Sequence, residues 1–202
     1  MKTMKLISIA IAAALLVPTA AMADPTDRGV ISVHKRDFHT KGQAKAEWVV
    51  QDAVQRICTQ TDDKPPAELA KALEADQMKT IPFPTGNMIG DWKKGAKIAA
   101  DGRGMTWNRP PSTNNGGGCY NCHQLSPEEV SFGTLGPSLK GFGKVRGSGA
   151  DTQKYLYGKI WNSKAYNLCS GMPRFGHSGT LTDAQIRDLI AYLLDPASPV
   201  NK

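Results

Sequence analysis

After residue 23 the sequence has no apolar run that could cross a bilayer, which takes about 20 residues of helix, so we expect no membrane span in the mature chain. It has no internal repeat and no low-complexity tract, which excludes repeat architectures. No series of strand-like segments is visible, and this argues against an all-β fold. There is no arginine-rich run, and nucleic acid is therefore not an expected partner.

The first residues have the pattern of a secretory signal peptide. Lys2 and Lys5 make a basic start, residues 6–17 are apolar apart from Ser8, and residues 21–23 read Ala-Met-Ala, a typical cleavage site. A membrane anchor is the alternative, but the apolar run is too short for it. We therefore predict a signal peptide at 1–23 and an exported chain, which in a bacterium would be periplasmic.

Cleavage would leave about 180 of the 202 residues, which is enough for one domain with or without an extension. The predicted signal peptide carries two lysines and no acid, so the formal charge falls from +7 to +5. A basic surface on an exported protein favours acidic protein partners through steered encounters, although it can also be no more than a solvated surface.

The five residues 119–123, Cys-Tyr-Asn-Cys-His, form a C-x-x-C-H motif, which is typical of covalent haem attachment. Cys119 and Cys122 can each form a thioether to a haem vinyl group, and His123 is then placed to bind the iron. A zinc ribbon would need a second such pair, and the other two cysteines are isolated. A thioredoxin-type site would need a preceding strand, whereas residues 114–118 read as a loop. We predict one covalently bound haem c.

The second axial ligand of the iron is expected between residues 161 and 180, ahead of the last predicted helix. Met172 and His177 are the two candidates there. Met172 precedes Pro173 in a glycine-flanked loop, a setting that suits a thioether ligand, while a lone methionine can also serve core packing. We expect Met172 to be the ligand and keep His177 as the alternative.

A His/Met pair would occupy both axial positions and favour electron transfer over chemistry at the iron. Residues 136–139, Gly-Pro-Ser-Leu, follow the haem motif. We expect the Pro137 carbonyl to accept a hydrogen bond from the ring N–H of His123, because such contacts orient a ligating imidazole and tune the metal.

The fold class that we predict is all-α: a class I cytochrome c-like domain over 87–202, preceded by a helical extension over 24–86. The stiff segment 81–86 marks the boundary. Residues 24–42 have no clear period and are expected to be an arm or, at 29–33, an edge strand. Apolar spacing and proline positions predict helices over 43–58, 67–79, 90–99, 151–161 and 183–194.

Three details of these helices can be checked. Gly95, inside a helix, indicates close packing against another element, because glycine there costs about 1 kcal/mol relative to alanine. Thr182 and Gln185 form a capping box that begins the last helix. In the helix over 151–161 we expect the side chains of Tyr155, Leu156 and Ile160 to face inward.

Cys58 and Cys169 remain in what should be an oxidising compartment. A disulfide between them would tie the extension to the loop of Met172 and close about 110 residues. We favour this bond. The alternatives are that one of the two is a sulfur-handling thiol, or that both are buried free cysteines.

Taken together, four segments resemble SoxX, the monohaem cytochrome subunit of the SoxAX complex of bacterial sulfur oxidation. They are the haem motif, Gly-Pro-Ser-Leu at 136–139, Met-Pro-Arg-Phe-Gly at 172–176 and Leu-Thr-Asp-Ala-Gln-Ile at 181–186. The resemblance covers about residues 90–194. The extension departs from short SoxX chains and is similar to the longer variety of the family.

The resemblance implies a role in an enzyme complex of the L-cysteine S-thiosulfotransferase type. SoxAX joins thiosulfate oxidatively to a cysteine of the carrier SoxYZ, and the substrate chemistry belongs to the SoxA subunit. The haem held by Cys119, Cys122, His123 and Met172 would accept electrons and pass them to a small cytochrome c. The sequence offers no convincing acid–base pair, so we nominate no catalytic residue.

Two other functions stay open. One is a free-standing class I cytochrome c shuttle, against which the extension and the two additional cysteines argue. The other is an enzyme acting at its own haem, such as a peroxidase, which would require an open or displaceable ligand.

Overall fold

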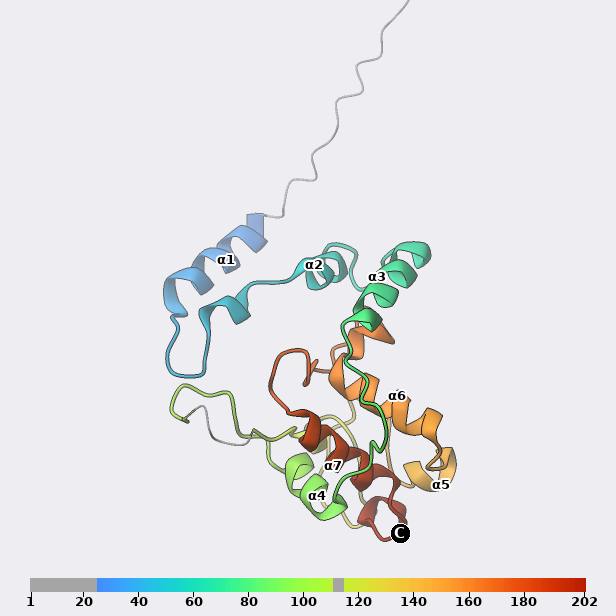
Figure 1. Cartoon of the computed structure of the whole chain (residues 1–202). Coiled ribbons are helices and arrows are strands. Elements are labelled where there is room, and N and C mark those ends of the chain that lie inside the picture. Colours follow the sequence, from blue (N-terminus) through green and yellow to red (C-terminus); the bar gives the residue numbers. More distant parts are fainter. Residues whose placement is uncertain (1–24, 111–114) are drawn as a thin grey trace, which may run out of the picture. The chain divides into compact units, whose positions relative to one another are not determined.

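The computed structural model describes residues 25–110 and 115–202, so the predicted signal peptide at 1–23 lies outside the described residues. Within those ranges the chain consists of helices and loops, with one isolated β-bridge and no strand, which confirms the all-α prediction (Figure 1). The chain divides into two compact units, one that contains α1 and one of residues 39–202. None of the helices in the described ranges is long and apolar enough to cross a membrane.

Helix α1 spans Pro25–Asp37, so the edge strand expected at 29–33 is wrong. A strand needs a partner for its backbone hydrogen bonds, and no strand lies in the described part of the chain. A helix satisfies these groups within itself. His34, Lys35 and Arg36 also stand in the last turn of α1, where positive charge suits the helix dipole.

The single helix expected over 43–58 is also wrong in its first half. The structure has a short 3-10 helix η1 (Ala46–Val49) and then helix α2 (Ala53–Gln60). Asp52 separates them because its carboxylate caps α2: it accepts a hydrogen bond from the Gln55 N–H at 2.8 Å, and the Gln55 side chain returns a bond at 2.9 Å. This capping box makes residue 53 the start of a new helix.

Helix α3 spans Ala67–Lys79, as predicted, with Pro66 at its N-terminal cap. Helix α4 (Trp92–Ala100) begins after Asp91, whose carboxylate caps its first turn. Between the longer helices lie the short helices η2 (Cys119–Asn121), α5 (Phe142–Arg146) and η3 (Ser163–Ala165), and η4 (Pro199–Asn201) follows the last long helix.

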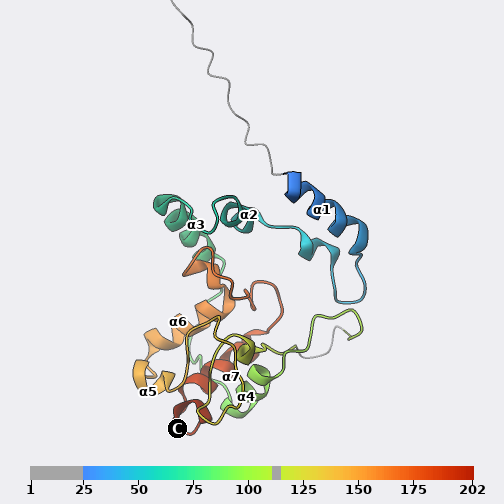
Figure 2. The same ribbon diagram turned by 180° about the vertical axis from the view of Figure 1, so that it is seen from behind.

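Helix α7 (Asp183–Leu194) forms the centre of the core, and it begins at the Thr182–Gln185 capping box that the sequence predicts. It runs beside α4, as Figures 1 and 2 both show. A Cβ on Gly95 would overlap the Asp188 carbonyl oxygen and lie 2.8 Å from Tyr192 Cβ. The close packing expected at Gly95 is confirmed.

Helix α6 (Ala150–Trp161) turns a different face inward from the one predicted. Leu156 and Ile160 are buried as expected, but Tyr155 is 43% exposed and Tyr157 is fully buried. Tyr157 donates a hydrogen bond to the Asp183 carboxylate at 2.7 Å, whereas Tyr155 packs edge-on against Tyr166.

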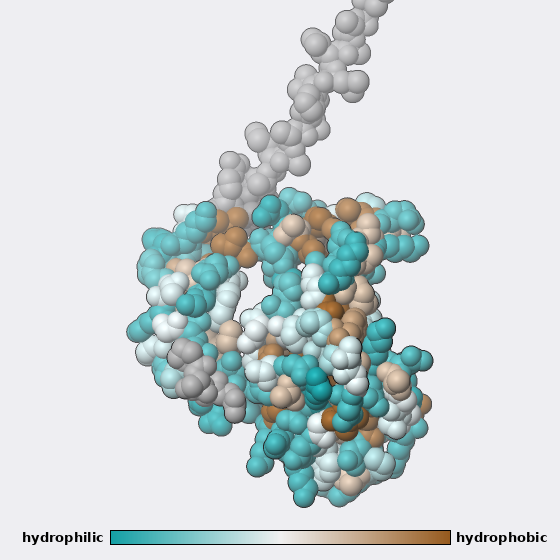
Figure 3. Space-filling model, viewed as in Figure 1, coloured by the Kyte–Doolittle hydropathy of each residue, from teal (hydrophilic) through white to brown (hydrophobic). Residues whose placement is uncertain are grey.

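Hydrophilic residues cover most of the face seen in Figure 3, with smaller apolar areas between them.

Candidate haem-binding site

The C-x-x-C-H motif folds as one tight turn. Gly118 enters it with a positive φ of 55°, a conformation that glycine adopts easily, and η2 follows. The Cys119 carbonyl oxygen accepts hydrogen bonds from the N–H groups of Cys122 at 3.1 Å and His123 at 2.9 Å. Neither cysteine of the motif is in a disulfide, so both thiols are available for thioether bonds. Burial raises the pKa of the Cys119 thiol to about 12.

The His123 ring is held from behind by the 136–139 segment. Its Nδ1 lies 2.7 Å from the Pro137 carbonyl oxygen, so the expected hydrogen bond is present. With Nδ1–H donating to Pro137, Nε2 is the nitrogen left for a metal. Gly136 lies so close to the ring that a Cβ there would overlap it.

Three of the predicted haem residues meet at one apolar pocket. Cys119, His123 and Met172 all line it, although Met172 is far from the other two in the sequence. The remaining lining residues come from α4, α6, α7 and the loops around the haem motif: Ala99, Leu125, Leu139, Ile160, Phe175, Leu189, Tyr192 and Leu193. The pocket thus brings together a cysteine, a histidine and a methionine of the predicted haem site on walls that are otherwise mostly apolar.

The loop of Met172 is held by its backbone. The Met172 N–H donates to Ser170 Oγ at 3.2 Å, and Ser163 Oγ donates to the Met172 carbonyl oxygen at 2.6 Å. His177, the alternative ligand, does not line this pocket in the described part of the chain. Burial, with the nearby Arg174 guanidinium, lowers the pKa of the His177 ring. The structure therefore places Met172, and not His177, on the pocket wall.

A cytochrome c family model matches residues 92–195. The chain belongs to the cytochrome c family. It is 36% identical over 183 residues, 85% of this chain and 86% of the relative, to a protein of Aquifex aeolicus (strain VF5) described as an uncharacterized lipoprotein. Among solved structures, SoxXA from P. pantotrophus is 26% identical, with 55% of this chain and 84% of that chain covered and a TM-score of 0.38.

The residues of this cytochrome fit a covalently bound haem c. The pocket pairs a C-x-x-C-H turn with a ring nitrogen of His123 and the thioether sulfur of Met172, both typical axial donors. Its other walls are almost entirely apolar, which suits a porphyrin face. Family membership and the two cysteines of the motif imply that the haem is attached by thioether bonds.

Two polar contacts in the cytochrome were not predicted from the sequence. The hydroxyls of Tyr120, inside the haem motif, and Tyr192, on α7, lie 2.6 Å apart, and Tyr192 also lines the pocket. The second contact is an ion pair between Asp52 and Arg174. The one available signal for the first contact was Tyr192 itself, a tyrosine among the mostly apolar residues of the last helix. The second contact joins residues 122 positions apart.

The structure joins Cys58 to Cys169 in a disulfide, as favoured from the sequence. The bond links α2 of the extension to the segment three residues before Met172. Cys58 is buried beside Val54 and Leu168 in a small apolar cluster of its own. The two alternatives, a reactive thiol and a pair of free cysteines, do not fit this arrangement.

Proposed function

We propose that this cytochrome transfers electrons through one haem c, with His123 and Met172 as axial ligands. The observation that carries the proposal is that these two side chains line the same apolar pocket as Cys119. Haem iron, when bound, supplies a one-electron couple between its ferric and ferrous states. Ligation by Met172 itself stays a prediction.

The residues of the proposed haem site have separate tasks. Cys119 and Cys122 anchor the group, and the Pro137 carbonyl fixes the tautomer and orientation of His123. Apolar side chains such as Leu189 and Phe175 keep water away, which limits the charge reorganisation that accompanies electron transfer. Two protein ligands would leave no axial position for a substrate, so electron transfer is favoured over peroxidase chemistry.

More narrowly, we propose a SoxX-type subunit of a thiosulfate-oxidising complex. The support is the resemblance of the motifs at 172–176 and 181–186, which are also joined in space, since the Leu181 N–H donates to the Phe175 carbonyl oxygen at 3.0 Å. A SoxA-type cytochrome would be the stable partner. It would couple thiosulfate to a cysteine of a SoxYZ carrier, and the two electrons released would leave through this chain to a small cytochrome c.

We also propose that the chain is exported to the periplasm. The support is the signal-like pattern of residues 1–23 and the name of the Aquifex relative, a lipoprotein. The division into an extension at 24–86 and a cytochrome domain at 87–202 is part of the same proposal.

Purification of the native protein from the host periplasm, with haem staining and mass analysis, tests the function. A one-haem chain that co-elutes with a larger cytochrome, and is reduced when thiosulfate and carrier are added, would support the SoxX-type role. A one-haem monomer without a partner would favour the free electron shuttle. Rapid binding of carbon monoxide or cyanide at neutral pH would favour a peroxidase.

The ligand assignment has its own test. Met172→Ala should abolish the weak long-wavelength absorption band that marks methionine bonded to ferric haem, while the haem stays covalently attached. Met105→Ala is the matched control, because Met105 lies in the loop between α4 and the haem motif and does not line the pocket. Retention of the band in Met172→Ala would show that another residue is the ligand.

A further inference from the structure

The extension contacts the loop of Met172 at the N-terminal side of the loop. The Leu168 N–H donates to the Glu74 carboxylate of α3 at 2.9 Å. The next residue, Cys169, is bonded to Cys58 of α2. The Leu168 side chain is buried in the same cluster as Cys58. Two helices of the extension therefore hold the chain where it enters the loop.

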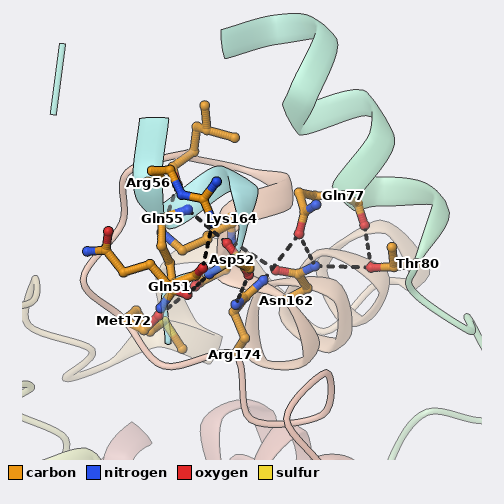
Figure 4. A network of polar contacts seen from close by, with 12 residues as sticks. Gln51, Asp52, Gln55, Arg56, Gln77, Thr80, Asn162, Lys164, Met172 and Arg174 are labelled. Atoms are coloured by element: carbon orange, nitrogen blue, oxygen red, sulfur yellow. Dashed lines mark hydrogen bonds and ion pairs between the residues drawn. The ribbon is translucent and has the colours of Figure 1, made fainter. Parts of the chain in front are cut away.

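The C-terminal side of the loop is held by an ion pair. Arg174, whose side chain is only 15% exposed, forms an ion pair with Asp52, the residue that caps α2. Its guanidinium also lies 3.5 Å from the Gln77 side-chain oxygen of α3. The same Gln77 oxygen accepts a hydrogen bond from Asn162 at 3.0 Å, so the contact belongs to a network that spans the extension and the segment after α6 (Figure 4).

The loop has little conformational freedom between these two contacts. Cys169 and Arg174 are three residues before and two residues after Met172. Pro173 fixes one of the intervening φ angles, and Ser163 holds the Met172 carbonyl oxygen. Figure 4 shows Met172 in the same network as Asp52 and Arg174. A loop fixed at both ends loses few conformations when its central side chain binds a metal.

We propose that Asp52 and Cys58 are positioning residues for Met172, through which the extension keeps the methionine sulfur on the iron. The inference rests on the proposed ligand role of Met172. It assigns a task to the extension, which the electron-transfer reaction itself does not require. Loss of either the ion pair or the disulfide raises the rate at which Met172 leaves the iron, while His123 and the thioether bonds stay in place.

Asp52→Asn separates the two tasks of this residue. Asparagine is as good an N-terminal cap as aspartate, so α2 keeps its first turn, but the charge that pairs with Arg174 is gone. Cyanide binding to the ferric protein reports on the loss of Met172, because cyanide must wait for the methionine to leave. We expect about tenfold faster cyanide binding, which corresponds to the loss of one hydrogen bond to a charged group. We also expect the methionine absorption band to fade at a lower temperature.

Two further variants complete the design. Cys58→Ser/Cys169→Ser removes the disulfide without leaving a thiol that could compete for the haem. It should also speed cyanide binding. Asp76→Asn is the control, because Asp76 pairs with Lys79 on the exposed side of α3, at 2.7 Å, away from the loop. It should bind cyanide at the unmodified rate. Far-UV circular dichroism melts show whether each variant is folded at the assay temperature.

The outcomes are distinct. Faster cyanide binding by Asp52→Asn, with a melt well above the assay temperature, supports the proposal. An unchanged rate in Asp52→Asn overturns it and leaves the ligand role of Met172 intact. A methionine band that persists in Met172→Ala overturns both. If the double cysteine variant fails to fold, the Asp52→Asn result decides.

Discussion

Gly95 of α4 lies against the backbone carbonyl of Asp188 in α7, with no room for a side chain between them. The contact continues at the start of α4, where the Gly90 N–H donates to the Arg187 carbonyl oxygen at 3.0 Å and the Asp91 N–H donates to the Asp188 carboxylate at 2.7 Å. This crossing sets how closely α4 approaches the helix that lines the haem pocket.

Gly95→Ala should destabilise the fold. Alanine favours an isolated helix by about 1 kcal/mol over glycine, but overpacking of a tight contact costs about 1–3 kcal/mol or more, and here the obstacle is backbone. Urea unfolding followed by circular dichroism measures the net loss. Gly29→Ala is the control, since Gly29 also lies inside a helix, α1, and a Cβ there meets nothing within 4 Å. Equal stability of the two variants would contradict the close crossing.

Gly136→Ala should disturb the His123 ring without removing the haem. The added methyl group would push the imidazole away and break its hydrogen bond to Pro137. A less electron-rich ligand stabilises ferric iron less well, so the reduction potential should rise. A hydrogen bond of about 1 kcal/mol corresponds to on the order of 40 mV for a one-electron couple. Redox titration measures the shift, and an unchanged or lower potential would argue against the role of this contact.

Loss of the disulfide should lower global stability. Cys58 and Cys169 are 111 residues apart, and in the chain-entropy model a crosslink over such a loop is worth about 4–5 kcal/mol, although typical measured values are about 2–4 kcal/mol. Cys58→Ser/Cys169→Ser should therefore unfold at a lower urea concentration. Comparison with the intact protein under non-reducing conditions checks this. Identical midpoints would mean that the bond does not form in solution.

The Asp52–Arg174 ion pair should add stability only above acid pH. Burial by itself would raise the pKa of Asp52, but hydrogen bonds from the Gln55 N–H and the Arg174 guanidinium outweigh it and hold the pKa below its usual range. A lowered carboxyl pKa stabilises the fold above the unfolded value of about 3.9, and that contribution is lost as the pH falls through the folded value. Unfolding curves of the unmodified protein and Asp52→Asn should thus differ at pH 7 and converge as the pH falls through the folded pKa of Asp52. A constant difference at all pH values would contradict this linkage.

Interactions within a few residues were predictable from the sequence. The C-x-x-C-H turn and the Thr182 capping box depend on neighbours three or four positions apart, and the start of α3 depends on the prolines directly before it, so these patterns are visible in the chain itself. The hydrogen bond from His123 to Pro137 spans 14 positions, and it was expected because Gly-Pro-Ser-Leu follows the haem motif at residues 136–139. The sequence alone thus determined the helical class and the haem-binding turn.

Contacts between distant segments were not predictable in this way. The Asp52 carboxylate, which caps α2, also meets Arg174 from the other end of the chain, and no local pattern indicates that pair. Tyr157 rather than Tyr155 faces inward because Asp183 offers it an acceptor. Met172, and not the other candidate His177, lines the apolar pocket. Only the tertiary structure decided these points, because local pattern records which faces of a helix are apolar but not which distant group each face meets.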